Sequence, residues 1–126
     1  MARILVAEDE ASVREFVARA LRLRGHEITA VEDGGAALEA LARAPYDLLL
    51  TDIVMPGLDG VALALKVSRD YPRMPVLLMT GFAAERQRAH NLSEIVCRVV
   101  TKPFTLKEIC AAVAEELDRA GLAATG

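Results

Sequence analysis

The sequence predicts an α/β fold in which a doubly wound, five-stranded parallel sheet is covered by helices on both faces. Short apolar segments alternate with helical segments of about ten residues, and this alternation is typical of right-handed strand–helix–strand crossovers. The segment Leu48-Leu49-Leu50 is apolar without a break, as expected of a strand buried on both faces of a parallel sheet. A length of 126 residues fits one domain, which we place at residues 1–118, followed by a flexible tail at residues 119–126.

The first strand is predicted at residues 4–7 and leads directly into a helix. The apolar residues of this helix recur at the spacing i, i+3, i+4, i+7 and i+8; they are Val13, Phe16, Val17, Ala20 and Leu21. Ser12 and Glu15 have the spacing of a capping box at its start, and Gly25 is placed to end it. The helix also carries four arginines, which indicate a solvated face or a docking face: Arg14, Arg19, Arg22 and Arg24.

The alternation continues through the middle of the chain. In order, we expect a strand at residues 26–31, a loop at 32–35, a helix at 36–43, a strand at 47–52, a helix at 61–69 and a strand at 75–80. In the helix predicted at residues 36–43, Leu38 and Leu41 face inward. Pro45 stops that helix, because the residue before a proline disfavours the helical conformation.

The C-terminal third contains one weak and one strong helix. Residues 83–91 are rich in Glu, Arg and Gln with only scattered Ala to bury, so we expect a weak, mobile helix there, followed by a strand at residues 96–101. The last helix starts at a capping box formed by Thr105 and Glu108. Its apolar face consists of Leu106, Ile109, Cys110, Val113 and Leu117.

Composition and charge exclude several classes of protein. The chain has 15 Lys and Arg against 18 Asp and Glu, a net charge of −3, and therefore lacks the basic surplus that neutralises nucleic-acid phosphates or anionic lipid. The apolar start is interrupted by Glu8, Asp9 and Glu10 and is too short for a secretory signal or a membrane span. We therefore expect a cytoplasmic protein that binds neither nucleic acid nor membranes directly.

Polar residues stand where the predicted strands end. They are Glu8 and Asp9 after the first strand, Asp52 at the end of the third, Thr80 at the end of the fourth and Lys102 after the fifth. In the flavodoxin-like strand order 2-1-3-4-5, the first and third strands are neighbours, and ligands bind outside the carboxyl ends at this point. The three carboxylates are therefore expected to converge. Taken singly, each residue has a plainer interpretation, such as a turn residue for Asp52 or a solvated charge for Lys102, but together these require a coincidence at four strand ends.

The residue types at this edge are those that phosphoryl transfer needs. Three carboxylates repel one another unless a cation lies between them, and hard oxygen ligands in this number suit Mg²⁺; the backbone carbonyl of Val54 completes the predicted metal site. Asp52 is the predicted nucleophile, while Mg²⁺, Thr80 and Lys102 stabilise charge on the phosphoryl oxygens. Gly81 has no side chain and leaves room for the phosphoryl group.

This pattern resembles the receiver domain of bacterial two-component response regulators over residues 2–117. The segments that carry the resemblance are Ala7-Glu8-Asp9-Glu10, Thr51-Asp52-Ile53-Val54-Met55-Pro56-Gly57-Leu58-Asp59-Gly60, Met79-Thr80-Gly81 and Thr101-Lys102-Pro103-Phe104. The resemblance implies that Asp52 accepts a phosphoryl group from a phosphohistidine. It also implies that Glu8 and Asp9 help to hold Mg²⁺, and that Thr80 and Lys102 contact the phosphoryl oxygens.

One position departs from the family pattern. The residue three before Lys102 is often Tyr or Phe in this family, but here it is Val99. The threonine-to-aromatic switch of the family therefore lacks its aromatic residue, and we expect phosphorylation to act through packing, by pulling Thr80 and shifting the helix at residues 83–91. The resemblance also implies a cis peptide bond between Lys102 and Pro103, which aims Lys102 inward.

The resemblance further implies the partners. A histidine kinase or a histidine phosphotransfer protein donates the phosphoryl group and docks on the surface of the first helix. No output domain is visible, so we expect a monomer or weak dimer that signals through a protein effector. The whole chain is similar to stand-alone receivers of cell-cycle phosphorelays that govern substrate delivery to the ClpXP protease, which makes ClpXP a candidate effector. A phosphate shuttle or sink is the alternative.

A hydrolase of the haloacid dehalogenase type is the rival from another class, because it also uses a strand-end Asp with Mg²⁺. That family needs a second acid two residues after the nucleophile, where this chain has Val54. We therefore expect a phosphoacceptor whose only chemistry is its own phosphorylation and dephosphorylation, and not an enzyme.

Overall fold

The computed structural model describes residues 2–81 and 98–121, in which five parallel strands form one sheet. The strands are β1 (Arg3–Ala7), β2 (Glu27–Val31), β3 (Leu48–Asp52), β4 (Val76–Thr80) and β5 (Arg98–Thr101). Their order is β2-β1-β3-β4-β5, which confirms the predicted fold class and strand order. The described helices are α1 (Ala11–Leu23), α2 (Gly34–Arg43), α3 (Gly60–Asp70) and α5 (Leu106–Arg119). The helix predicted at residues 83–91 lies outside the described residues.

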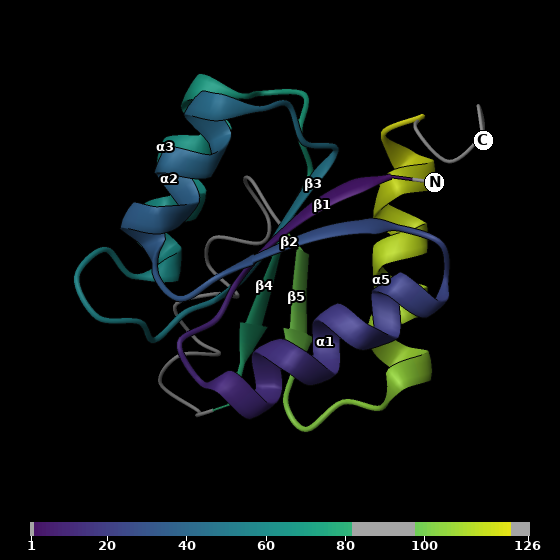
Figure 1. The fold of residues 1–126 in the computed structure, drawn as a ribbon. Helices are drawn as coiled ribbons and strands as arrows, with labels where there is room; N and C mark the ends of the chain where they lie inside the picture. The colour runs from purple at the N-terminus through teal and green to yellow at the C-terminus, as the bar shows by residue number, and fades with distance from the viewer. Residues whose placement is uncertain (1, 82–97, 122–126) are drawn as a thin grey trace.

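The helices cover the sheet in two layers (Figure 1). α1 and α5 lie on one face, and α2 and α3 lie on the other. Successive residues of a strand point to opposite faces, so Ile4 of β1 joins the apolar cluster under α1 and α5, and Leu5 joins the cluster under α2 and α3. Both side chains are completely buried, and burial of this kind stabilises the fold by about 1.5–3 kcal/mol per residue. The two clusters therefore hold the strands in place from both sides.

Among the helices in residues 2–81 and 98–121, none has both the length and the apolar character that crossing a membrane requires.

Side-chain caps set the starts of three helices. Asp33 caps α2 and Asp59 caps α3, each through a carboxylate that accepts the backbone N–H three residues later. Because Asp33 takes this role, α2 begins at Gly34, inside the predicted loop, and the prediction of a start at residue 36 is wrong. The capping box of Thr105 and Glu108 at the start of α5 is confirmed, with both of its hydrogen bonds formed.

The start of α1 differs from its prediction, whereas its end agrees. The predicted capping box at Ser12 is wrong, because the chain becomes helical directly after Glu10 and Ser12 already lies inside the helix. The Ser12 hydroxyl instead donates to the Glu10 carboxylate at 3.3 Å, and no side-chain hydrogen bond caps α1. At the other end, Gly25 adopts a φ of 91°, and the N–H groups of Gly25 and His26 bond to carbonyls of the last turn, as in a Schellman motif.

Two residues assigned to the buried faces of helices are exposed. Phe16 of α1 is 43% exposed, and Leu106 of α5 is also exposed. Leu106 is the first residue of α5, and Phe16 lies near the middle of α1 and lines a hollow at the carboxyl edge of the sheet. The Phe16 ring lies beside that of Phe104, with the ring centroids 6.4 Å apart, so an apolar surface stays open at this edge.

Candidate functional site

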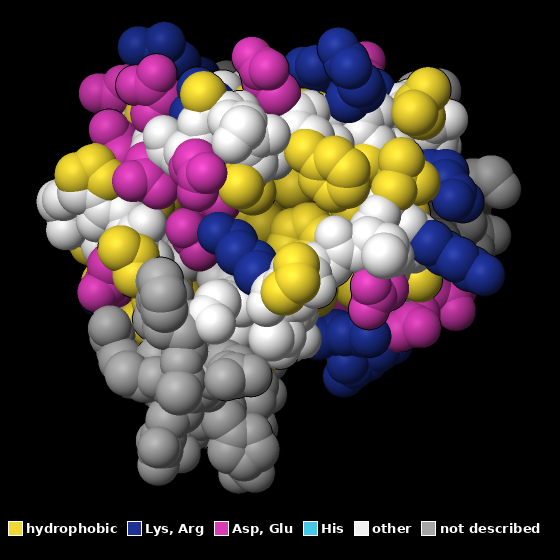
Figure 2. Space-filling model, turned by 90° about the horizontal axis from the view of Figure 1, so that it is seen from below, with side chains coloured by type: hydrophobic (Ala, Val, Ile, Leu, Met, Phe, Trp, Pro, Cys, Tyr) yellow, Lys and Arg dark blue, Asp and Glu magenta, His cyan; other side chains and the backbone are white. Residues whose placement is uncertain are grey.

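Four of the predicted site residues lie together at the carboxyl edge of the sheet. Glu8 directly follows β1, Asp52 ends β3, Thr80 ends β4 and Lys102 directly follows β5. These strands are neighbours and parallel, so their carboxyl ends meet. Figure 2 views the molecule from this side and shows acidic side chains gathered beside a hollow with a hydrophobic floor.

A buried network of charges occupies the centre of this edge. The Lys102 Nζ lies 3.0 Å from Glu8 Oε1 and 3.2 Å from Asp52 Oδ1. Glu8 and Asp52 are buried, whereas Asp9 is exposed. Each of these three acids places one carboxylate oxygen within 4.8 Å of the other two. Two of these acids pair with the Lys102 ammonium and the third lies beside them, so the excess negative charge and the hard oxygen atoms fit a divalent cation such as Mg²⁺.

The burial of this network shifts its titration. Burial raises the pKa of Glu8 to about 7, and the charge of Asp52 adds to the rise, while hydrogen bonds from the Glu10 N–H and from Lys102 oppose it. Burial acts to lower the pKa of Lys102, but its hydrogen bond to Glu8 and the charges of Asp52 and Glu8 outweigh burial and leave that pKa raised. Lys102 therefore stays charged at neutral pH, and Glu8 takes up a proton more readily than an exposed glutamate does.

Thr80 carries an unpaired hydroxyl at the same edge. The residue is completely buried, and its Oγ1 has no hydrogen-bond partner among the described residues. Most buried polar atoms are paired, and leaving one unpaired costs about 1–3 kcal/mol. Because Thr80 ends the strand next to that of Asp52, its hydroxyl is suited to donate to an oxygen-rich group attached to Asp52.

The remaining predicted residues surround this centre. Val54 and Gly81 line the same hollow, but the metal contact of the Val54 carbonyl and the space provided by Gly81 stay predictions. A Cβ at Gly81 would lie at an ordinary contact distance of 3.7 Å from Lys102 Cβ. The Lys102–Pro103 peptide bond is cis, as the resemblance implies. Val99 is partly buried against the apolar cluster under α2 and α3.

Two further residues, which the sequence did not assign to the site, lie against the backbone of its acids. A Cβ at Gly60 would lie 2.0 Å from the carbonyl oxygen of Asp52, so only glycine allows α3 to start this close to the end of β3. The sequence assigns Gly60 only to a turn, since no local signal reports that contact. Arg14 donates from Nη1 to the carbonyl of Glu8 at 2.8 Å. Its side chain is 18% exposed, so Arg14 does not lie on a solvated face.

The hollow joins the acidic centre to an apolar surface (Figure 2). Asp9, Asp52 and Lys102 line one part of it. The other part lies between the start of α1 and the segment that leads into α5, and it is lined by Val13, Phe16, Pro103 and Phe104. A molecule that reaches Asp52 through the hollow therefore also meets this apolar surface.

Comparison with known families decides what kind of domain this is. The sequence matches the response regulator receiver domain over residues 4–114. The chain belongs to this family. This receiver domain is 38% identical over 109 residues to the response regulator receiver protein CpdR of Brucella abortus, covering 86% of this chain and 91% of CpdR. It is 36% identical over 113 residues to the response regulator FleR of Pseudomonas aeruginosa, covering 90% of this chain but only 24% of that longer protein.

Solved structures of receiver domains have the same fold. The receiver domain of NtrX from Brucella abortus superposes with a TM-score of 0.84 at 28% identity, covering 91% of this chain and 98% of that one. A receiver domain protein from Clostridium thermocellum gives a TM-score of 0.87 at 23% identity, covering 97% and 98% of the two chains, which shows the fold alone. The chain is therefore a signalling domain of a two-component system, with the acidic cluster at the place where receiver domains bind Mg²⁺.

Proposed function

We propose that Asp52 accepts a phosphoryl group from a phosphohistidine donor in the presence of Mg²⁺. A carboxylate oxygen of Asp52 attacks phosphorus, the P–N bond to the donor imidazole breaks, and the electron pair of that bond stays with the imidazole. Glu8 and Asp9 hold the metal together with Asp52 and the Val54 carbonyl. When bound, Mg²⁺ supplies positive charge that offsets the charge on the phosphoryl oxygens.

The observation that carries this proposal is the set of donors around Asp52. The Lys102 ammonium lies 3.2 Å from Asp52 Oδ1, and the buried Thr80 hydroxyl has no partner among the described residues. Donors placed in advance where negative charge will develop stabilise the transition state, because they need no rearrangement during the reaction. A phosphoryl group on Asp52 accounts for the buried lysine and the unpaired hydroxyl, and the divalent cation accounts for the surplus of acids.

Incubation with acetyl phosphate and Mg²⁺ tests the acceptor. Mass spectrometry is expected to show one added phosphoryl group on the wild type and none on Asp52→Asn. Asp70→Asn is the matched control, because it makes the same substitution at the end of α3, where the acid pairs with Arg69. An unchanged mass gain in Asp52→Asn contradicts the assignment, and steady release of phosphate from phosphoesters indicates a hydrolase instead.

The hollow beside Asp52 is the proposed docking surface for the donor, a histidine kinase or a histidine phosphotransfer protein. Phe16 lines the apolar part of the hollow and is 43% exposed. Burial of such a residue against a partner helix contributes to binding. Phe16→Asp is expected to slow phosphoryl transfer from a phosphorylated histidine phosphotransfer protein by about tenfold. Uptake from acetyl phosphate should stay unchanged, because a small molecule needs no docking surface. Equal slowing with both donors contradicts this assignment.

The proposed output is a change in packing near Thr80 that a protein effector reads. Val99 has neither an aromatic ring nor a hydroxyl that could move together with Thr80. The change is therefore expected to spread through the apolar contacts of β5. Amide chemical shifts with and without beryllofluoride, which imitates the phosphoryl group, test this transmission. No perturbation beyond the residues that touch the ligand, over residues 80–105, would contradict it.

The effector is proposed to be a protein partner, with ClpXP as the first candidate because of the likeness to stand-alone cell-cycle receivers. Capture of ClpX by the wild type should differ between the presence and the absence of beryllofluoride, whereas capture by Asp52→Ala should not respond. A phosphate shuttle or sink predicts no capture in either state and rapid return of the phosphoryl group to the histidine phosphotransfer protein.

A further inference from the structure

The loop between β1 and α1 carries two of the three acids of the proposed metal site. Glu8 is held on both sides of its backbone: its N–H donates to the Val31 carbonyl at 3.0 Å, and its own carbonyl accepts from Arg14 Nη1 at 2.8 Å. Its carboxylate accepts from the Glu10 N–H at 3.1 Å and from Lys102 at 3.0 Å. Arg14 is thus the side chain that ties the backbone of this acidic loop to α1.

This tie matters because α1 begins without a side-chain cap. α2, α3 and α5 each start at an Asp or Thr whose side chain accepts a backbone N–H of the first turn. The N-cap of α1, Glu10, makes no such bond, so among the described residues no capping side chain joins this loop to the first turn of α1. The hydrogen bond from Arg14 reaches back from the first turns of α1 and supplies a restraint at Glu8.

The charge of Arg14 by itself does not favour metal binding. A guanidinium this close to Glu8 repels a metal ion and competes with it for the same negative charge, which weakens cation binding. The second contact of Arg14 is to Glu32 in the loop before α2, at 3.9 Å, and Glu32 is largely exposed, so this contact contributes little. Arg14 acts on the position of the site, because its short hydrogen bond fixes the backbone of Glu8, whose buried carboxylate is a proposed metal ligand.

We infer that Arg14 is a positioning residue for the metal site, holding the loop of Glu8 and Asp9 so that their carboxylates meet Asp52. This inference rests on the proposed function, because it assumes that the three acids bind Mg²⁺. Residues that orient metal ligands typically change metal affinity by 10–100-fold when they are removed. Arg14 therefore affects Mg²⁺ affinity in the direction opposite to its charge.

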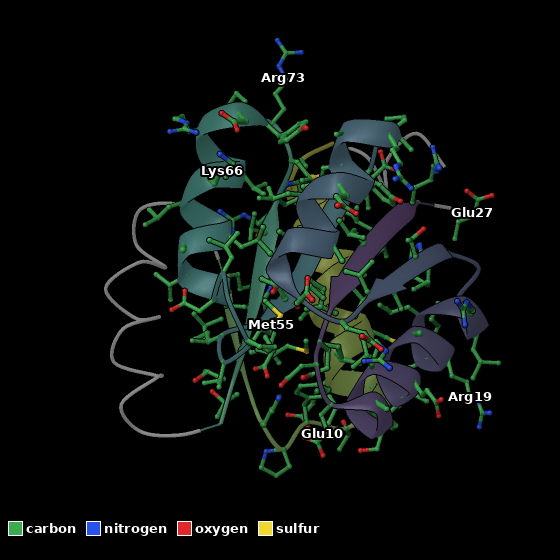
Figure 3. All side chains as sticks on the ribbon, turned by 60° about the vertical axis from the view of Figure 1, so that its left-hand side comes forward. Glu10, Arg19, Glu27, Met55, Lys66 and Arg73 are labelled. Carbon is green, nitrogen blue, oxygen red and sulfur yellow. The ribbon has the colours of Figure 1, made fainter. Side chains whose placement is uncertain are left out.

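The direction in which Arg14 changes Mg²⁺ affinity is tested by Mg²⁺ titration of the unphosphorylated protein, followed by calorimetry or amide chemical shifts. Arg14→Met keeps the apolar stem but removes the donors and the charge, and it is expected to raise the Mg²⁺ Kd by about tenfold. Arg19→Met is the matched control, because Arg19 lies on the same helix and points away from the molecule in Figure 3; its Kd should stay equal or fall slightly. Arg14→Lys retains the charge and one donor group and should give an intermediate Kd.

The outcomes separate this inference from the proposed function. A Kd for Arg14→Met equal to or below that of the wild type overturns the positioning role, and so does an equal rise in Arg19→Met. A wild type that binds no Mg²⁺ overturns the proposed metal site itself and the inference with it. If Arg14→Met does not fold, as judged by its amide spectrum, Arg14→Lys decides alone: a Kd raised at least threefold supports the inference, and a smaller rise or none overturns it.

Discussion

The two edges of the sheet carry similar ion pairs but bury them to different extents. At the carboxyl edge, the side chain of Lys102 is 24% exposed, while those of its partners Glu8 and Asp52 are 0% and 9% exposed. At the opposite edge, Arg3 lies 3.4 Å from Glu27, and these side chains are 43% and 68% exposed. Figure 3 shows Glu27 at that second edge, at the surface of the molecule.

Burial decides which of these ion pairs can be replaced without loss of stability. An exposed ion pair contributes about 0–1 kcal/mol, because water competes for both charges. A buried charge costs several kcal/mol to desolvate, and removal of its partner leaves that cost uncompensated. The charges at the carboxyl edge are therefore costly to bury and suited to binding a charged group. The charges at the other edge have little effect on the stability of the fold.

The largest expected effect is the loss of the buried cation. Lys102→Met leaves two buried carboxylates without their ammonium, and we expect it to lower the free energy of unfolding by about 3 kcal/mol. Arg3→Met at the other edge should cost less than about 1 kcal/mol. Urea unfolding of both variants in EDTA at pH 7 measures the contrast. Equal losses would show that burial does not distinguish the two edges.

The next effect concerns the glycines of the two edges. Gly60→Ala forces a Cβ toward the Asp52 carbonyl, and overpacking of this kind costs about 1–3 kcal/mol. Gly25 follows α1 at the opposite edge with open space around it and a φ of 91°, so Gly25→Ala should cost about 1 kcal/mol from backbone strain alone. The variants are compared by urea unfolding, and acetyl phosphate uptake is the second readout. Only Gly60→Ala should also slow uptake, and normal uptake in that variant would contradict the contact with Asp52.

A further effect is the pH dependence that Glu8 confers on the protein without bound metal. Burial raises the pKa of Glu8 from 4.5 to about 7, so the folded state binds more protons than the unfolded state between these values. Its contribution to stability is present below pH 4.5 and is lost as the pH rises through about 7. The free energy of unfolding in EDTA should therefore fall less steeply over this range in Glu8→Gln. Identical pH profiles in the two proteins would argue against a raised pKa.

The smallest expected effect has the opposite sign and belongs to the other edge. Burial lowers the pKa of His26 from 6.5, and its Nδ1 accepts a hydrogen bond from the Ala2 N–H. The unfolded state therefore binds the proton more readily, so this contribution to stability is present above pH 6.5 and is lost as the pH falls through the lowered pKa. His26→Gln should flatten the acid side of the stability profile, and an unchanged profile there would contradict the lowered pKa.

Local signals predicted the features that local forces decide. Apolar runs located β1, β3 and β4, and the pair Thr105 and Glu108 located the start of α5, because both bonds of that box lie within one helical turn. The pair Ser12 and Glu15 has the same spacing but forms no box. The chain turns into α1 at Glu10, and this entry point depends on the end of β1, which the spacing does not report.

The site divides in the same way. Strand ends occupied by Glu8, Asp52, Thr80 and Lys102 could be read from the order of residues, because right-handed crossovers place the carboxyl ends of parallel strands at one edge. The burial of Glu8 and the unpaired hydroxyl of Thr80 could not be predicted from the sequence, since both depend on which neighbouring segments cover these side chains.

Residue types and their order along the chain were enough to predict the fold class and, with the strand order typical of that class, which acids and lysine share an edge of the sheet. The folded structure was needed to find that Arg14 turns inward to Glu8, that Gly60 touches the backbone of Asp52 and that Phe16 stays open beside the site. Arg14 and Gly60 lie close in sequence to the residues that they contact, but these contacts depend on how α1 and α3 are placed relative to the ends of β1 and β3. Their distances follow from how helices pack on the sheet, which no local pattern of residues encodes.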